Sequence, residues 1–157
     1  MGNVLVTYFS ASGSTRKVAT KLSEAIGATL LEIKPAQKYT GRDLNWNDKH
    51  SRSTLEMNDR ASRPAMAENI DVANYNTIFI GFPIWWYTAP RIINTFLESG
   101  DFSGKKIILF ATSGGSGLGD TAADLKVSAP NAEFISGKIF KSTVSVDELK
   151  AWAKIYE

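Results

Sequence analysis

Three nearly continuous apolar runs constrain the fold of this chain more than any other feature. They cover residues 4–9, 77–82 and 106–111 and are rich in valine, isoleucine, leucine and phenylalanine. Unbroken runs of this kind are typical of strands covered on both faces, because a strand with one face in water alternates apolar and polar residues. Segments with apolar residues at helical spacing follow the first two runs, at Val18, Ala19, Leu22, Ala25, Ile26, Ile92, Ile93, Phe96 and Leu97. Strands alternating with helices predict βαβ units, and hence an α/β fold with a mostly parallel sheet.

Weaker signals complete this pattern. Residues 29–33 are expected to form a second strand, and a fifth begins at residues 133–135, where Gly137 marks either a bulge or the end of the strand. A short helix is expected over residues 120–127, and a last helix after the S-x-x-E capping box that starts at Ser145. The chain therefore has enough elements for a five-stranded sheet with helices between the strands.

Residues 36–76 are the hardest part of the chain to interpret. They predict one or two short helices within 43–59, among many polar residues. Apolar residues recur throughout and nothing resembles a flexible linker, so we expect a single domain over residues 1–157. Trp46 and Trp152 are expected to be structural.

Composition excludes several classes of protein. The absence of cysteine excludes disulfides, thiolate metal sites and cysteine nucleophiles. The net charge of +2, without a dense basic stripe, gives no support for nucleic-acid binding. No apolar run is long enough to span a bilayer and the amino terminus lacks a cleavable leader, so a cytoplasmic location is expected. The oligomeric state stays open.

The loop after the first strand favours an anion. It carries four hydroxyls and a glycine and leads straight into a helix, whose amino terminus presents unpaired N–H groups and partial positive charge. A polar turn that merely caps the helix is the alternative. The candidate phosphate-binding residues are Ser10, Ser12, Gly13, Ser14 and Thr15.

Two further loops are expected at the same edge of the sheet, because the carboxyl ends of parallel strands meet there. The loop after the third strand is aromatic, and at least one of its two tryptophans is expected to contact a flat ligand, whereas its tyrosine either stacks on that ligand or packs against the neighbouring loop. This loop comprises Pro83, Ile84, Trp85, Trp86 and Tyr87. The loop after the fourth strand is rich in glycine, which lets main-chain amides approach ring heteroatoms, and it comprises Thr112, Ser113, Gly114, Gly115 and Gly117.

A phosphate-binding loop beside an aromatic loop and a glycine-rich loop suits flavin mononucleotide (FMN), which combines a phosphate with a planar ring. A dinucleotide fits less well because the first turn lacks G-x-G-x-x-G, and a nucleoside triphosphate is disfavoured because G-x-x-x-x-G-K-[ST] is absent. No metal site and no catalytic side chain are assigned, since the flavin itself would carry the electrons.

Over essentially its whole length, the chain resembles the flavodoxin-like family of short-chain type. The resemblance rests on S-x-S-G-S-T from Ser10, G-F-P-I-W-W from Gly81 and T-S-G-G from Thr112. It implies a three-layer α/β sandwich with a five-stranded parallel sheet in the order 2-1-3-4-5, and bound FMN. In that family the first loop holds the phosphate, the second lines the isoalloxazine ring, and the third contacts its pyrimidine side.

The sequence departs from electron-carrier flavodoxins in two respects. Those carriers are usually strongly acidic, whereas this chain is slightly basic, and many have a flexible glycine in the loop after the third strand, where this chain has P-I-W-W. We therefore expect an FMN-dependent reductase that passes electrons from NAD(P)H to a quinone or a similar small acceptor. The alternatives are a flavodoxin-type carrier serving a redox partner protein, and a binding module without FMN.

Overall fold

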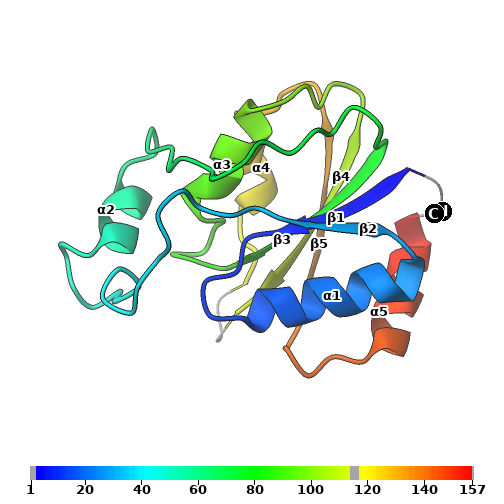
Figure 1. Ribbon diagram of the computed structural model, residues 1–157, viewed down its shortest axis with the longest axis horizontal. Coiled ribbons are helices and arrows are strands. Elements are labelled where there is room, and N and C mark those ends of the chain that lie inside the picture. The colour runs from blue at the N-terminus through cyan, green and yellow to red at the C-terminus, as the bar shows by residue number, and fades with distance from the viewer. Residues whose placement is uncertain (1–2, 114–116, 157) are drawn as a thin grey trace.

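The computed structural model describes residues 3–113 and 117–156, and in it one parallel sheet organises the chain (Figure 1). The five strands lie in the order β2-β1-β3-β4-β5, and every neighbouring pair is parallel. The predicted α/β architecture and strand order are therefore confirmed. The strands are β1 (Val4–Tyr8), β2 (Thr29–Glu32), β3 (Thr77–Pro83), β4 (Lys106–Thr112) and β5 (Glu133–Ile139).

Helices cover both faces of the sheet, as the apolar strands require. One face carries α1 (Ser14–Ile26) and α5 (Val146–Ala153), which pack against each other, and the other carries α3 (Arg91–Glu98) and α4 (Thr121–Lys126) (Figure 1). A one-turn 3-10 helix, η1 (Lys154–Tyr156), follows α5. Among the described residues, no helix is long and apolar enough to cross a membrane.

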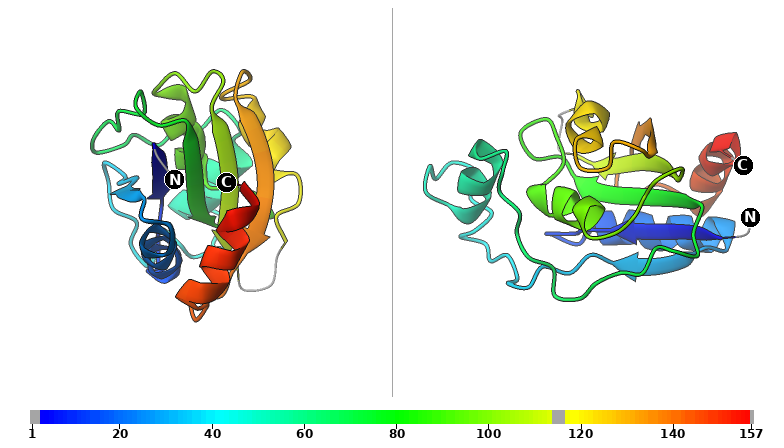
Figure 2. Two further views of the ribbon diagram at one scale, coloured as in Figure 1. Left: turned by 90° about the vertical axis from the view of Figure 1, so that its right-hand side faces the viewer. Right: turned by 90° about the horizontal axis from the view of Figure 1, so that it is seen from above.

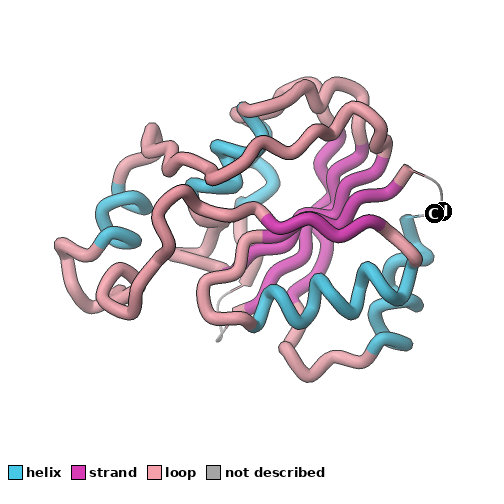
Figure 3. Tube along the Cα trace, in the orientation of Figure 1, coloured by secondary structure: helices cyan, strands magenta, loops and turns pink. Residues whose placement is uncertain are grey.

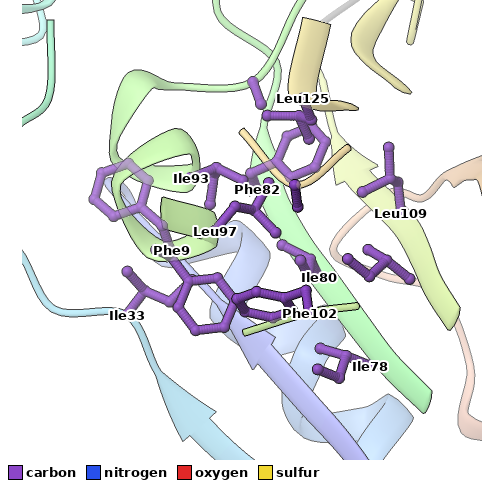
Figure 4. Close-up of a cluster of buried hydrophobic side chains, with 14 of the residues drawn as sticks. Phe9, Ile33, Ile78, Ile80, Phe82, Ile93, Leu97, Phe102, Leu109 and Leu125 are labelled. Atoms are coloured by element: carbon purple, nitrogen blue, oxygen red, sulfur yellow. The ribbon is translucent and has the colours of Figure 1, made fainter. Parts of the chain in front are cut away.

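Each face of the sheet has its own hydrophobic core. The α3/α4 side includes Phe9, Ile80, Phe82 and Leu97, which are at most 1% exposed (Figure 4). Burying a side chain of this size contributes roughly 1.5–3 kcal/mol. These cores hold the strand ends, and hence the loops that leave them, in fixed relative positions.

The helix boundaries follow local chemistry. Gly27 ends α1 in the left-handed conformation at φ 65°, where glycine carries no steric penalty. Ser145 caps α5, and its hydroxyl accepts a hydrogen bond from the Glu148 N–H at 3.1 Å. Both boundaries agree with the sequence pattern.

Gly137 marks a bulge rather than the end of β5, because the strand continues to Ile139. The β4–β5 register shifts between Ile108 and Phe110, opposite this glycine. A methyl group on Gly137 would collide with the carbonyl oxygen of Leu109 and would lie 2.9 Å from Trp152 Cζ2. Only glycine fits at this close approach of the two strands.

The long connection between β2 and β3 contains one helix, α2 (Arg52–Asn58), which lies beyond the carboxyl ends of the strands (Figures 1 and 2). Figure 3 shows that most of the rest of this connection is loop. Trp46 is 72% exposed, so the expectation that it is structural is wrong, whereas Trp152, 8% exposed, is part of the core.

Candidate functional site

The first loop ends in a helix amino terminus that is open to an anion. Gly13 precedes α1 in the left-handed conformation at φ 99° and provides no side-chain cap, and the first turn carries no acidic residue. The main-chain N–H groups of Gly13 and Arg16 both donate to the Ser10 hydroxyl, at 3.1 and 3.3 Å. Donors that converge on one oxygen atom in this way are suited to an oxygen of a phosphate group.

The other residues predicted for this loop are placed differently. Ser12 is exposed and Ser14 half-buried, whereas Thr15 is 1% exposed. The Thr15 and Thr112 hydroxyls are 2.8 Å apart and form a buried hydrogen bond. Thr15 therefore joins the first loop to the end of β4.

Basic residues adjoin the first loop on the β2 side. A cleft of about 670 Å³ extends from residues 9–13 to Lys34 and Lys38, which are exposed, and it also contains the Arg16 side chain. Arg16 donates to both carboxylate oxygens of Glu32, at 3.0 and 3.2 Å, so its charge is already paired. The two lysines add positive charge close to the first loop and the amino terminus of α1.

The second loop is built around a tight turn with two aromatic residues at its centre. Trp85 and Thr88 exchange two main-chain hydrogen bonds, with N···O distances of 2.9 and 3.1 Å. Trp86 and Tyr87 have φ values of 49° and 65°, which makes this a type I′ turn. Bulky residues in the left-handed region cost about 1–2 kcal/mol each, and such strain concentrates at functional sites.

The two tryptophans of this loop have different surroundings. Trp85 is half-buried and packs edge-on against Phe9 and Tyr39, with ring centroids 5.7 and 5.4 Å apart. Trp86 and Tyr87 are 41% and 69% exposed. The turn therefore leaves Trp86 and Tyr87 exposed while Trp85 anchors it.

The third loop meets the second. Pro83 pairs with Thr112 in the sheet, and the Ile84 N–H donates to the Thr112 carbonyl at 2.9 Å. Ser113 is half-buried and Gly117 exposed, whereas Gly114 and Gly115 lie outside the described residues. A methyl group on Gly119 would lie 3.0 Å from the Tyr87 carbonyl oxygen, so the chain beyond this loop also packs closely against the turn.

Pairwise contacts thus bring the three predicted loops to one edge of the sheet. The first and third loops meet at Thr15 and Thr112, the second and third at Ile84 and Thr112, and the first and second at Phe9 and Trp85.

Tyr39 packs against the aromatic loop, a contact that sequence reasoning missed. Besides its contact with Trp85, its hydroxyl donates to Glu56 at 2.5 Å and the Arg52 guanidinium lies 3.8 Å above its ring. Burial and the Glu56 carboxylate raise the pKa of Tyr39, so its hydroxyl stays protonated and keeps donating. Tyr39 lies in the connection that the sequence pattern could not resolve.

The strain in the turn leads to a prediction on stability. Replacing Tyr87 with glycine is expected to raise the free energy of unfolding by about 1 kcal/mol, because glycine adopts positive φ without penalty and the exposed ring loses little packing. Urea denaturation measures the change. Tyr87→Phe keeps the strain and should leave stability unaltered; equal stabilities for all three proteins would show that the turn stores no strain.

Comparison with known proteins agrees with this geometry. The family model described as Flavodoxin matches residues 3–156. A candidate flavoprotein from Bacteroides uniformis is 49% identical, with 98% of each chain covered and a TM-score of 0.92. Another from Bacteroides eggerthii is 44% identical, covering 99% of this chain and 98% of that chain, with a TM-score of 0.92.

A flavoprotein from Lactobacillus acidophilus, solved in complex with FMN, has 23% identity and a TM-score of 0.73, covering 98% of this chain and 99% of that chain. Comparison with curated proteins gives no match. The family and this FMN complex support the predicted cofactor. With the fold and strand order confirmed and nearly the whole chain matched, the protein belongs to the flavodoxin family.

Proposed function

We propose that this flavodoxin-family protein binds FMN at the edge formed by its three loops and acts as an NAD(P)H-dependent reductase of quinones or similar small acceptors. Bound FMN supplies hydride and electron transfer chemistry. The protein's own residues bind and orient it. In this proposal residues 83–87 contact the isoalloxazine ring. The phosphate is bound by Ser10, Ser12, Gly13, Ser14 and Thr15. The pyrimidine side of the ring is contacted by Thr112, Ser113, Gly114, Gly115 and Gly117.

The donor set of the described residues fits this cofactor. Gly13, which precedes α1, provides no side-chain cap, and the first turn carries no acidic residue. The N–H groups of Gly13 and Arg16 converge on the Ser10 hydroxyl oxygen. Trp86 and Tyr87 present exposed aromatic surface at the neighbouring loop. Stacking on such surface and hydrogen bonding to fixed amides are the means by which a protein orients a flavin and tunes its electronics.

The observation that favours a reductase over a carrier is the conformation of the aromatic turn. Flipping the peptide between Trp86 and Tyr87 would convert the type I′ turn into type II′, which requires glycine at its first central position. Tryptophan occupies that position here, so the peptide is held in one orientation. A main chain that cannot respond to the redox state of the ring is poorly suited to stabilising an odd-electron state, and two-electron transfer is favoured.

Charge supports the same conclusion. The chain has 18 basic and 16 acidic residues, and its net charge of +2 does not provide the acidic surface that would steer a basic partner protein. A small acceptor needs no such surface.

Anaerobic stopped-flow mixing of the FMN-loaded protein with NADH or NADPH tests this function. We expect the flavin absorbance to fall faster than for free FMN at the same concentration, and reoxidation when a quinone is added. Reduction at the free-FMN rate would reject the reductase. A potentiometric titration should then show a single two-electron step, whereas two separated one-electron steps would favour the carrier.

A further inference from the structure

A second cleft opens beside the aromatic turn, away from the first loop. Its volume is about 550 Å³, within the range of small-molecule sites, and its walls come from the end of α2 and the segment after it, the turn, the start of α3, and α4. Trp86 and Tyr87 line this cleft. Because the same two side chains are proposed to face the flavin ring, the cleft lies directly next to the proposed redox centre.

Three arginines line this cleft: Arg60, Arg63 and Arg91. Arg91 is 9% exposed, and it donates to the carbonyl oxygens of Met57 at 2.8 Å and Glu56 at 3.4 Å, which belong to the last turn of α2. Among the described residues it forms no ion pair. Burial, followed by the positive charge of Arg60, lowers the pKa of Arg91.

Two carboxylates near these arginines already accept hydrogen bonds from other groups. Glu98 accepts from Arg63 Nε at 3.0 Å, and Asp124, which lines the cleft, accepts from the Thr88 hydroxyl at 2.7 Å. Asp120 also lines the cleft, and the negative charges of Asp124 and, to a smaller extent, Asp59 favour the charged form of Arg91. The cleft is therefore lined by three guanidinium groups and by two carboxylates, those of Asp120 and Asp124.

Of the three arginines, Arg60 makes the fewest side-chain interactions within the described residues. Its side chain is exposed and, within residues 3–113 and 117–156, makes no hydrogen bond or ion pair. By contrast, Arg63 is held by Glu98 and also donates to the carbonyl oxygens of Arg60 and Ser62. The available positive charge is therefore concentrated around Arg60 and Arg91, next to exposed aromatic surface.

We propose that this cleft binds the anionic group, a phosphate or a carboxylate, of the small molecule that exchanges electrons with the flavin. The proposal rests on the function proposed above. Guanidinium groups recognise both anions through charge-assisted hydrogen bonds. A molecule anchored at Arg60 and Arg91 can extend its other end across Trp86 and Tyr87 towards the ring. Two sources share this chemistry: the phosphates of a nicotinamide nucleotide and the acidic group of an acceptor.

Isothermal titration of the FMN-loaded protein with inorganic pyrophosphate tests the site without turnover. We expect one binding event that Arg60→Gln weakens about tenfold, the typical effect of losing one charge-assisted contact. Arg42→Gln is the matched control, because Arg42 is an exposed arginine of the same connection outside this cleft, and it should bind as tightly as the parent. Absence of binding, or equal affinity for Arg60→Gln, overturns the proposal.

Steady-state kinetics of Arg60→Gln then identify the source. A KM about tenfold higher for NAD(P)H assigns the cleft to the nicotinamide nucleotide, and a KM raised only for an acidic quinone assigns it to the acceptor. Both values unchanged would contradict the proposal. If neither nucleotide reduces the protein while pyrophosphate still binds through Arg60, the anion site stands and the reductase function falls.

Discussion

The Ser14→Asp variant is expected to bind FMN about 100-fold more weakly while its apoprotein becomes more stable. Ser14 is the first residue of α1, whose amino terminus is proposed to hold the phosphate. A carboxylate there gains about 0.3–1 kcal/mol from the helix dipole, so the free energy of unfolding should rise. Close to a bound phosphate the same carboxylate is expected to cost about 2.7 kcal/mol of binding free energy through like-charge repulsion, which corresponds to the 100-fold loss. Flavin fluorescence quenching measures the affinity, and urea denaturation the stability.

Two control variants separate charge from shape in this experiment. Ser14→Asn keeps the size without the charge and should lose less than tenfold in affinity, following the modest net value of one hydrogen bond. Ser103→Asp adds the same charge at an exposed residue in the loop before β4, at the opposite end of the strands, and should leave affinity unchanged. If Ser14→Asp were more stable yet bound FMN as the parent does, the phosphate would have to lie elsewhere.

The Gly137→Ala variant is expected to lose about 3 kcal/mol or more of its free energy of unfolding. The added methyl group would meet the Leu109 carbonyl and the Trp152 ring, and the main chain of β4 cannot move without disturbing the centre of the sheet. Overpacking of this kind usually costs 1–3 kcal/mol, and a collision with main chain belongs at the upper end. Urea denaturation gives the value.

Gly41→Ala is the matched control for this variant. A methyl group at Gly41 meets nothing within 4 Å, so its stability should stay within about 0.5 kcal/mol of the parent. If Gly137→Ala were equally stable, the β4–β5 register described above would be wrong.

The sheet could be predicted from sequence because its central strands carry a strong and local signal. β3 and β4 have unbroken buried centres, which no alternative element explains as well. By contrast, α2 buries Ser53 and Thr54 and leaves Leu55 54% exposed. Because polar residues are buried and an apolar residue is exposed, the helix shows no apolar stripe, and the sequence cannot reveal which of its faces packs.

The site was predictable in outline but not in its details. The loops are brought together by the parallel topology, which the sequence pattern indicates. The different surroundings of Trp85 and Trp86 depend on a type I′ turn that lacks its usual Asn-Gly signal, so local sequence could not reveal it. The arginine cleft joins Arg60 and Arg91 from separate elements, and only the folded chain shows their proximity.

Amide-resolved nuclear magnetic resonance of the protein, recorded before and after one equivalent of FMN, tests most directly whether a single cofactor touches all three loops. The account predicts that the largest shifts fall together on residues 10–15, 84–88 and 112–118. Shifts confined to one of these segments, or centred at the opposite edge of the sheet, would contradict it.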